Sequence, residues 1–584
     1  MKILTLHVDY INFKPLKKAL KSIGDLSEAE KKGQELGESL VVLTAIEKGD
    51  LVKETVAELV KNVIDIAGQV KVKNIVLYPY AHLSNNLSSP DVAIEILEKS
   101  TKELAKDFNV TKAPFGYYKE FEMKVKGHPL SELSREIRTG TLTADKDMII
   151  SSSKKLKESV KSEDYNPEQL LREISKSKLD TSKLKDNDHR IIGREMDLFS
   201  FSEIAPGMVF WHNNGLIIRN ELIDFWREVH RKSGYEEIST PQMMDSKLWK
   251  ISGHWDKYKE SNFISEYEGR PFLLKPMNCP GGMLVYRNRP RSYKELPLRV
   301  AEMGVVHRVE LSGVLSGLFR AIQFTQDDAH IFCADEKQAK EEIKGVASLI
   351  DFFYKKFGLG FDHVELSTRP EKRIGSDETW DASEKLLEDT LKSLKIKYQI
   401  NKGQGAFYGP KIDFHVKDSL GRTWQVSTIQ LDFSMPERFK LEYVDKNNER
   451  KMPIMLHRVI YGSLERFIGI LLEDKNGRLP TWLAPKQVRV LSFTDRNEDY
   501  GKKIVKKLSE EIPKLRIDSD FRSLPVSSKV REAELLRVPY IIVIGDKEEK
   551  DGSLAVRTRG DSKIKSVKVD KFIKDLKEEI EERI

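Results

Sequence analysis

The sequence predicts a multidomain protein that combines α/β and α+β architecture. Its 584 residues exceed what one hydrophobic core usually organises. Strand-like and helical patterns alternate near both ends, which is typical of α/β units, and the middle contains a long apolar hairpin. A segment rich in lysine, serine and aspartate follows the first unit. We therefore predict domains at residues 1–145, 191–484 and 485–584, with a linker at 146–190 that holds one helix near residues 168–174.

The first segment alternates short apolar strands with amphipathic helices, as an α/β unit requires. The predicted strands are residues 3–8, 40–46 and 74–80, and the predicted helices are 52–70 and 90–108. His82, Lys119 and Glu132 are its candidate functional residues, although each taken alone is also typical of an ordinary solvated surface.

Composition bounds the class of protein. Hydrophobic residues make up 39% and charged residues 33%, and no apolar run is long enough to span a bilayer. The N-terminus meets a charge too early for a signal peptide, so we expect a cytoplasmic protein without membrane contact. The two cysteines, Cys279 and Cys333, exclude a disulfide framework and leave either thiol open to metal binding. A net charge of +7 permits a polyanionic partner without requiring one.

Residues 299–333 form the most informative stretch. An apolar strand, a Gly/Ser-rich loop and an apolar return over 318–324 predict a hairpin. Arg308 and Arg320 flank the loop, and planar guanidinium groups suit phosphate oxygens. A solvated hairpin with ordinary surface charge is the plain alternative.

Two further patterns surround this hairpin. Residues 216–232 predict an amphipathic helix, followed by a strand that ends before Pro241. Residues 462–467 open another apolar helix that carries Arg466 in its first turn. As isolated patterns, both are also compatible with ordinary helix starts.

The last segment again alternates strands and helices, which predicts a separate small α/β domain. Its predicted strands are residues 488–493, 540–544 and 554–559, its helices are 500–511, 529–536 and 569–584, and 545–548 is a turn. Basic residues recur in it and are compatible with either a nucleic-acid interface or a solvated face. They are Lys529, Arg531, Arg537, Arg557 and Arg559.

These motifs resemble a known family. Arg308-x-Glu310, the loop and the returning strand resemble motif 2 of class II aminoacyl-tRNA synthetases. Residues 324–332, Phe-Thr-Gln-Asp-Asp-Ala-His-Ile-Phe, are similar to threonyl-tRNA synthetases of the archaeal type. The helix–strand–proline pattern and residues 462–466 are similar to motifs 1 and 3, in the family's order.

The resemblance implies a fold for each segment. Residues 1–145 resemble an editing domain related to D-aminoacyl-tRNA deacylases, 191–484 a class II catalytic domain built on an antiparallel sheet, and 485–584 an anticodon-binding domain. It also implies a homodimer that binds tRNA(Thr), L-threonine and ATP, with the tRNA contacted by basic residues. These are Lys529, Arg531, Arg557 and Arg559.

The resemblance further implies a nucleotide site. Activation joins a carboxylate to the α-phosphate of ATP, so cations must lie where negative charge accumulates, with Mg²⁺ neutralising the remainder. Arg308 is implied at the α-phosphate, Arg466 near the γ-phosphate and Glu310 at the adenine amino group. The remaining implied contacts are Arg320 and Lys411 to phosphates, Gln425 beside the nucleotide, Asp328 to the substrate ammonium, and Gln326 and Tyr408 around the pocket.

The spacing of Cys279, His330 and His457 matches no compact zinc-ribbon pattern, but the resemblance places all three on one Zn²⁺ per subunit. A three-ligand zinc keeps an open position for substrate. Threonine offers it an amino and a hydroxyl group, valine lacks the hydroxyl, and serine lacks only a methyl worth about 1–3 kcal/mol. Serine must therefore be removed by a second site.

The resemblance implies that the first domain supplies this second site and hydrolyses seryl-tRNA(Thr). Its residues would bind the tRNA 3′ end or order the attacking water. They are His82, Tyr118, Lys119 and Glu132.

The chain departs from the family pattern in places. Gly282 stands where histidine is common, Ser316 replaces another common histidine, and residues 321–323 and 212–215 also differ. The leading prediction is an ATP-dependent threonine ligase with editing. The alternatives are an editing and tRNA-binding protein with a decayed synthetase module, or a class II synthetase for proline or serine.

Overall fold

A computed structural model describes most of the chain and divides it into two compact units, residues 1–148 and 149–584. The described residues are 1–20, 23–48, 50–84, 87–128, 130–137, 168, 171–172, 184–257, 262–418, 421–561 and 563–583. The helix predicted near residues 168–174 lies largely outside them.

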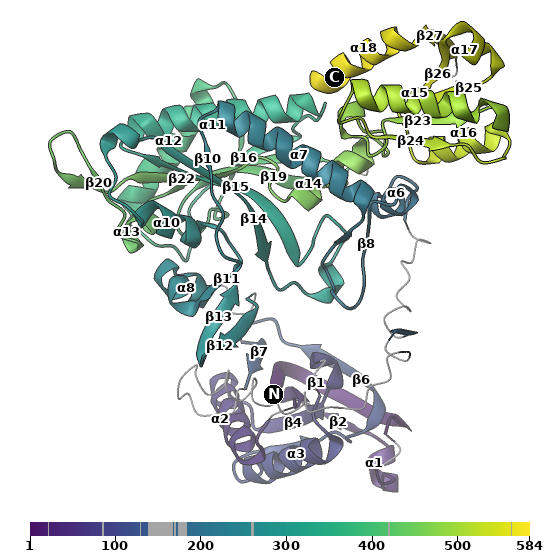
Figure 1. The fold of residues 1–584 in the computed structure, drawn as a ribbon. Helices are drawn as coiled ribbons and strands as arrows, with labels where there is room; N and C mark the ends of the chain where they lie inside the picture. The colour runs from purple at the N-terminus through teal and green to yellow at the C-terminus, as the bar shows by residue number, and fades with distance from the viewer. Residues whose placement is uncertain are drawn as a thin grey trace. The chain divides into compact units, whose positions relative to one another are not determined.

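The first unit is a seven-stranded sheet with two long helices on one face (Figure 1). Its order is β2-β1-β3-β4-β5, and the long β1 also pairs with β6 and β7. The strands are β1 (Lys2–Lys18), β2 (Gln34–Leu36), β3 (Ser39–Ala45), β4 (Asn74–Pro79), β5 (Asn109–Lys112), β6 (Tyr117–Val125) and β7 (Glu132–Glu136); the helices are α1 (Glu28–Lys31), α2 (Val52–Val70) and α3 (Pro90–Leu104).

The period of the apolar residues explains this layering. Every third or fourth residue of α2 and α3 is buried against Ile3, Leu40 and Ile75, which face one side of the sheet. Alternate strand residues such as Leu6 and Tyr78 point to the other side, which these two helices do not cover.

The core of the second unit is an eight-stranded, largely antiparallel sheet of order β10-β14-β15-β22-β19-β18-β16-β17. An antiparallel sheet in this segment is what the sequence analysis predicts. The strands are β10 (Glu236–Glu237), β14 (Leu298–His307), β15 (Gln323–Cys333), β16 (His363–Ser367), β17 (Gln399–Asn401), β18 (Lys411–Lys417), β19 (Thr423–Asp432) and β22 (Ile454–Val459).

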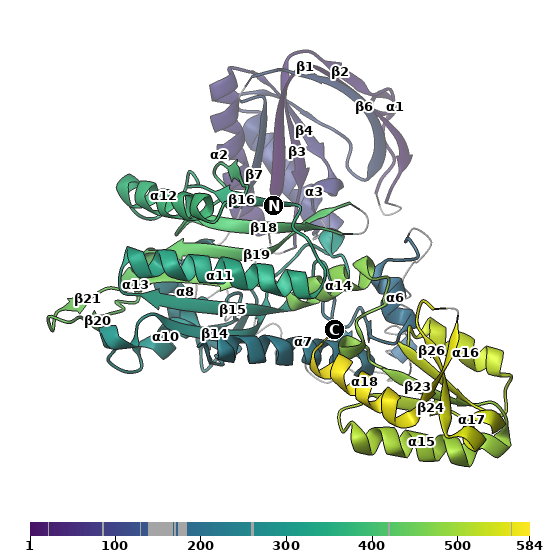
Figure 2. The ribbon, with the colours of Figure 1, turned by 90° about the horizontal axis from the view of Figure 1, so that it is seen from above.

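Strand alternation gives this sheet a core face and a polar face. Ala329 and Ile331 of β15 and Leu456 of β22 join the core beneath the long helices (Figure 2), whereas Asp328, His330 and His457 point the other way. The helices on the core face are α6 (His189–Glu195), α7 (Asn213–Lys232), α11 (Glu336–Lys356), α12 (Asp377–Ser393) and α14 (Leu464–Asp474). On the polar face lies α10 (Cys279–Arg287).

The C-terminal part has a five-stranded mixed sheet of order β24-β23-β25-β26-β27, flanked by helices. Its elements are β23 (Val488–Ser492), α15 (Glu498–Glu511), β24 (Ile517–Asp520), α16 (Val526–Leu535), β25 (Tyr540–Ile544), α17 (Asp546–Asp551), β26 (Ser553–Thr558), β27 (Ile564–Lys568) and α18 (Val569–Glu581). The turn predicted at residues 545–548 is wrong, because α17 begins there with Glu548 accepting from the Gly545 amide.

The hairpin is shorter than predicted. β14 ends at His307 and β15 begins at Gln323, so Arg308, Glu310 and Arg320 lie in the connection and not on strands. Leu318 and Phe319 are apolar because they pack in the main core as part of this loop, where they face Gly469 of α14.

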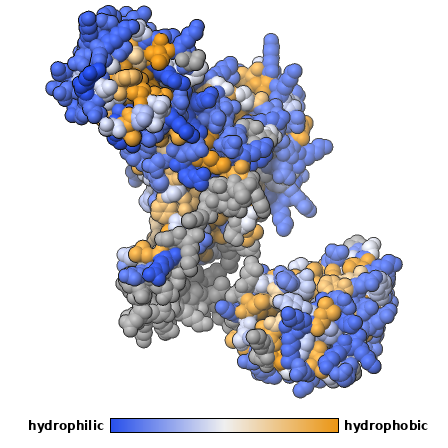
Figure 3. All heavy atoms as spheres, turned by 90° about the vertical axis from the view of Figure 1, so that its right-hand side faces the viewer, coloured by the Kyte–Doolittle hydropathy of each residue, from blue (hydrophilic) through white to orange (hydrophobic). Residues whose placement is uncertain are grey.

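Within the described residues, no helix is long and apolar enough to cross a bilayer. Hydrophilic residues cover most of the coloured surface in Figure 3, as the high charged content predicts.

Candidate active site

A cavity of about 350 Å³ opens on the polar face of the large sheet. It receives side chains from β15, β18, β19 and β22, from α10 and from the start of α14. The residues predicted from sequence that line it are Cys279, Arg308, Gln326, Asp328, Tyr408, Lys411, Gln425, His457 and Arg466. The structure therefore brings together residues that are spread over 188 positions of the chain.

The candidate metal ligands converge at one end of this site. His330 and His457 are register partners on the antiparallel strands β15 and β22, and their rings lie 4.9 Å apart between centroids. Cys279 is the first residue of α10. The ligand atoms of all three lie within 4.8 Å of one another, and all three residues are buried.

The surroundings of the three residues fit a metal ion. His457 Nε2 lies 2.7 Å from Asp432 Oδ2, which leaves Nδ1 for a metal. His330 Nε2 is buried without a hydrogen-bond partner among the described residues, and the nearest acid oxygen, Asp328 Oδ2, is 3.9 Å away. One thiol and two imidazoles form a donor set that zinc accepts. Burial raises the pKa of Cys279 and lowers that of His330.

Of the two glycines after Cys279, Gly281 has a steric explanation, because a Cβ there would lie 2.8 Å from Thr240 Cβ. A Cβ on Gly282 would lie 3.4 Å from His330 Nδ1, which is ordinary contact. Helix α10 therefore passes close to the ring of His330.

Asp327 and Asp328, which are neighbours on β15, have different contacts. Asp327 is fully buried and accepts from the amides of Ile460, Tyr461 and Gly462 at 2.9, 3.1 and 2.9 Å, which fixes the loop before α14. Asp328 points into the cavity, where burial raises its pKa to about 6. The alternation of β15 thus separates a loop anchor from a candidate ligand for an ammonium group.

Arg466 is placed by its backbone neighbours. Its Nε donates to Phe319 O and its Nη1 to Gln425 O, both at 3.0 Å, and its guanidinium lies over the Trp424 ring. Burial lowers its pKa, and the charges of Arg320 and Arg308 lower it further. Adjacent cations of this kind repel one another unless an anion lies between them.

The connection between β14 and β15 holds the other predicted nucleotide residues. Arg308 Nε donates to Pro276 O at 3.1 Å, and its guanidinium lies over the Phe324 ring. Glu310 and Arg320 are not among the residues that line the cavity, and Arg320 Nε donates to Glu310 Oε2 at 3.0 Å. Both charges act on Arg466, so the pair lies beside the site, and its adenine and phosphate roles stay predictions.

Asp413 connects several cavity residues and was missed by the sequence argument. It is almost fully buried, ion-paired to Lys411, and accepts from Gln425 Nε2 at 2.6 Å and Thr428 Oγ1 at 2.9 Å. Its only sequence signal is its position two residues after Lys411, on the same face of β18.

The first unit holds the residues predicted for editing. Lys119 Nζ lies 5.0 Å from the centroid of Tyr78 and donates to the carbonyls of Pro114 and Tyr117, and burial lowers its pKa to about 8. His82 is exposed, with its ring 5.4 Å from that of Tyr80.

Two more predicted editing residues lie on this unit. Tyr118 is 62% exposed, and Glu132 is the register partner of Leu6. Register partners project to the same face, so Glu132 shares with Leu6 the side of the sheet that α2 and α3 do not cover.

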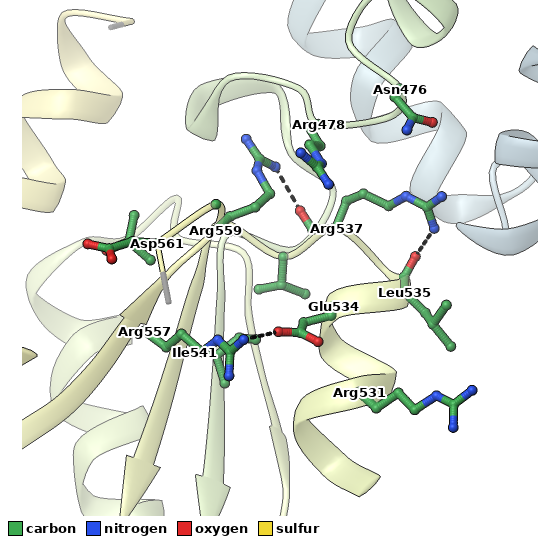
Figure 4. A pocket seen from close by; sticks show the side chains of 13 residues that line it. Asn476, Arg478, Arg531, Glu534, Leu535, Arg537, Ile541, Arg557, Arg559 and Asp561 are labelled. Atoms are coloured by element: carbon green, nitrogen blue, oxygen red, sulfur yellow. Dashed lines mark hydrogen bonds and ion pairs between the residues drawn. The ribbon is translucent and has the colours of Figure 1, made fainter. Parts of the chain in front are cut away.

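The C-terminal part contains an arginine-rich pocket of about 520 Å³ (Figure 4). Arg531, Arg557 and Arg559, the predicted tRNA contacts, line it together with Arg478 and Arg537.

The basic side chains of the C-terminal part differ in ion pairing and in burial, and therefore in how readily they could bind a ligand. Arg557 pairs with Glu534 at 2.6 Å, and burial lowers the pKa of Arg559 to about 10. Lys529 lies elsewhere: it is buried, and its Nζ donates to Ser492 O at 3.0 Å.

Comparison with solved structures decides the family. The chain is 38% identical to a crystallised RNA binding domain of threonyl-tRNA synthetase from Cryptosporidium parvum Iowa II, with a TM-score of 0.65, over 67% of this chain and 98% of that one. The chain belongs to the threonyl-tRNA synthetase family. Curated threonine–tRNA ligases agree: that of Caldanaerobacter subterraneus subsp. tengcongensis is 52% identical over 396 residues, as is that of Clostridium botulinum strain 657.

Three family models match successive segments of this threonyl-tRNA synthetase family member. The archaea-specific editing domain of threonyl-tRNA synthetase matches residues 1–137, the tRNA synthetase class II core domain (G, H, P, S and T) matches 262–475, and an anticodon binding domain matches 487–579. The alignments with the curated ligases cover 68% of this chain and 61–62% of theirs.

Proposed function

We propose that this protein ligates L-threonine to tRNA(Thr) with ATP, through threonyl-adenylate, and hydrolyses mischarged seryl-tRNA(Thr). The observation that carries the proposal is the shared cavity, which is lined by Cys279 and His457 as well as by Arg308 and Arg466. A single site thus combines candidate amino-acid ligands with cations suited to a nucleotide.

The activation step needs positioning and positive charge more than covalent chemistry. The threonine carboxylate attacks the α-phosphate of ATP, and pyrophosphate leaves. Arg308 would contact the α-phosphate and Arg466 the γ-phosphate side, since both guanidinium groups are held by backbone carbonyls at the cavity. Lys411 and Gln425, both held by Asp413, would line the nucleotide site, and Mg²⁺ would bind the phosphates.

Cys279, His330 and His457 would hold one Zn²⁺, and their buried, mutually close donor atoms support this assignment. Bound zinc supplies an open Lewis-acid position at which an amino and a hydroxyl group can be recognised. Asp328 would accept from the substrate ammonium, and Gln326 and Tyr408 would bound the pocket.

The first unit would remove serine from tRNA. Lys119 and Tyr118 would contact the 3′ end of the tRNA, and His82 and Glu132 would orient the ester or its attacking water. Glu132 and Tyr78, which Lys119 contacts, lie on the same side of the sheet, away from α2 and α3, and this supports a shared face for the editing residues.

Each segment receives a role in this proposal. Editing is assigned to residues 1–145, synthesis to 191–484 and anticodon binding to 485–584. In the last segment Arg531, Arg557 and Arg559 would contact tRNA phosphates across the pocket of Figure 4, since arginine suits phosphate oxygens. We further infer a cytoplasmic homodimer joined through α7 and β10.

An editing protein with a decayed synthetase module is not favoured. The arginines and the three candidate zinc ligands are all present, and they are placed around one cavity or beside it. A synthetase for proline or serine would leave the buried Cys279–His330–His457 cluster without a role.

Exchange of pyrophosphate into ATP tests the proposal. In the wild type we expect pyrophosphate exchange with threonine and serine but not with valine. The Cys279→Ala variant should lose this exchange. Both the wild type and Cys279→Ala should still deacylate seryl-tRNA(Thr). Folded, zinc-loaded protein that deacylates seryl-tRNA(Thr) without any threonine-dependent exchange would overturn the synthetase proposal.

A further inference from the structure

A second cluster of possible metal ligands lies toward the far edge of the large sheet. His363 and Glu365 are two residues apart on β16, so their side chains share a face, and His415 on β18 is the register partner of His363. β16 and β18 run side by side in Figure 2. His457 is in register with Gln430 and Lys411, and His415 lies four residues further along β18. At strand spacings of about 4.8 Å and a rise of about 3.3 Å per residue, the cluster therefore lies roughly 15–20 Å from His457.

The distances within this cluster suit a common ion. Glu365 Oε1 is 3.3 Å from His363 Nε2, and Glu365 Oε2 is 3.6 Å from His415 Nε2. Ligands placed about 2.0–2.2 Å from a tetrahedral zinc lie roughly 3.3–3.6 Å from one another. The ligand atoms of all three residues fall within 4.8 Å, and each side chain is only 15–23% exposed.

The neighbours of these residues orient them toward one another. His363 Nδ1 lies 2.8 Å from Asp362 Oδ2, an acceptor that holds the Nδ1 proton and leaves the lone pair on Nε2. Asn401 of β17 donates to Glu365 Oε2 at 2.8 Å, which fixes the carboxylate. A carboxylate behind a histidine and an amide behind a carboxylate are the outer contacts that metal ligands usually have.

With both histidines neutral, the cluster has too few protons for the hydrogen bonds that its atoms could make. If neutral His363 donates to Asp362, its Nε2 lone pair faces the Glu365 carboxylate, which is a second acceptor. His415 Nε2 is buried and has no hydrogen-bond partner among the described residues. The two rings are stacked with their centroids 4.4 Å apart, and each Nε2 lies beside one oxygen of Glu365, so a cation bound between them would satisfy both nitrogens.

We propose that His363, Glu365 and His415 bind a second divalent transition-metal ion, with zinc as the expected occupant. Two imidazoles and one carboxylate form a donor set that zinc accepts, and the remaining position would face solvent. The ion ties β16 to β18, the strand that carries Lys411 and Asp413 on the same face, and so stiffens one wall of the cavity. This inference does not depend on the proposed reaction.

Metal stoichiometry in the full chain tests the site. After loading with Zn²⁺ and desalting, we expect two zinc ions per wild-type chain, one in Cys279→Ser, one in His415→Gln and none in the double variant. His212→Gln is the matched control, because His212 also pairs with a carboxylate, Asp197 at 2.6 Å, but belongs to no such cluster. Zinc content that is equal in Cys279→Ser and the double variant would overturn the proposal.

Cobalt distinguishes the two sites by spectrum and guards against misfolded variants. In Cys279→Ser we expect visible d–d bands without thiolate charge transfer, and their loss in an added Glu365→Gln, which keeps an acceptor for Asn401. Asp362→Asn should weaken cobalt binding roughly 10–100-fold while leaving the ligands in place. A cobalt affinity unchanged by Glu365→Gln, in protein with native circular dichroism, would refute the site.

Discussion

Two buried clusters in the large domain have the same apparent ability to bind a metal, yet they differ in what their atoms already contact. Cys279, His330 and His457 form one, and Asp188, His189 and Glu473 form the other; in each, the ligand atoms lie within 4.8 Å. The first leaves His330 Nε2 without a hydrogen-bond partner among the described residues.

In the second cluster, both ring nitrogens are used. His189 Nδ1 lies 2.8 Å from Glu473 Oε1, and Nε2 accepts from the Leu318 amide at 3.0 Å. Asp188 pairs with Arg190 at 2.8 Å.

The difference separates a binding site from a structural joint. In the second cluster, hydrogen bonds within the protein compensate the desolvation of each polar group, and the cluster joins α6 to α14. In the first cluster, hydrogen bonds within the protein do not fully compensate the desolvation of the buried polar atoms, so binding of an ion or substrate there is favoured. Proximity of ligand atoms therefore identifies candidates, and hydrogen-bond satisfaction ranks them.

The largest expected effect is on the first cluster. Cys279→Ser should release zinc and lower threonine-dependent pyrophosphate exchange by about 10³-fold, since a catalytic metal supplies several kcal/mol. Cys333→Ser is the matched control: Cys333 is equally buried but belongs to the apolar core on the other face. Equal exchange in the two variants, measured at equal folded concentration, would remove the functional distinction between the clusters.

The second cluster should respond in stability and not in chemistry. Glu473→Ala leaves His189 Nδ1 without its buried acceptor and removes one of the two carboxylates that Arg422 contacts, the other being Asp418. We therefore expect a loss of about 3 kcal/mol in the free energy of unfolding of this domain. Thermal melting measures the loss. Zinc content, and exchange per folded molecule well below the transition, should equal the wild-type values; a fall in zinc content would show that the two clusters are coupled.

The spacing of apolar residues predicted helices and strands well where an element buries only one of its faces. The helix over residues 52–70 and the strand over 540–544 are confirmed as α2 and β25, because their apolar spacing has a single structural solution. The return strand of the hairpin was placed too early, since the apolar Leu318 and Phe319 serve the core from a loop and not from a strand.

The site was predictable only in part. Family resemblance pointed to Cys279, His330 and His457, while the supporting contacts depend on register between distant strands. Asp432 and Asp413 hold their partners across β19, β22 and β18, and nothing in their local sequence reveals which residue lies opposite.

Asp432 tests whether contacts around the Cys279–His330–His457 cluster matter, because it holds His457 without being one of the three candidate ligands. Asp432→Asn keeps a side-chain oxygen for the Ser434 and Met435 amides but weakens the acceptor that orients His457. We expect zinc affinity to fall roughly 10–100-fold, as is usual when an outer carboxylate is altered. Competition with a chelating dye measures it. An unchanged affinity would mean that His457 is oriented by packing alone.

The smallest effect that we expect concerns Lys119 in the first unit, where the editing residues lie. Lys119 is another incompletely compensated group: its side chain is half-buried and donates to two backbone carbonyls, with no carboxylate partner among the described residues. Burial lowers its pKa to about 8, so the side chain is charged at pH 7 and mostly neutral at pH 9. Loss of this cation weakens contact with an anionic tRNA end.

Deacylation of seryl-tRNA(Thr) at subsaturating substrate should therefore fall about tenfold from pH 7 to pH 9, once the uncatalysed hydrolysis is subtracted, because a group with a pKa near 8 loses about nine-tenths of its charge. Lys119→Arg should flatten this profile, since arginine stays charged throughout. Pyrophosphate exchange, which depends on arginines, should not share the decline. A profile that is the same in wild type and Lys119→Arg would show that Lys119 does not act through its charge, and that incomplete compensation alone does not mark a functional group in this fold.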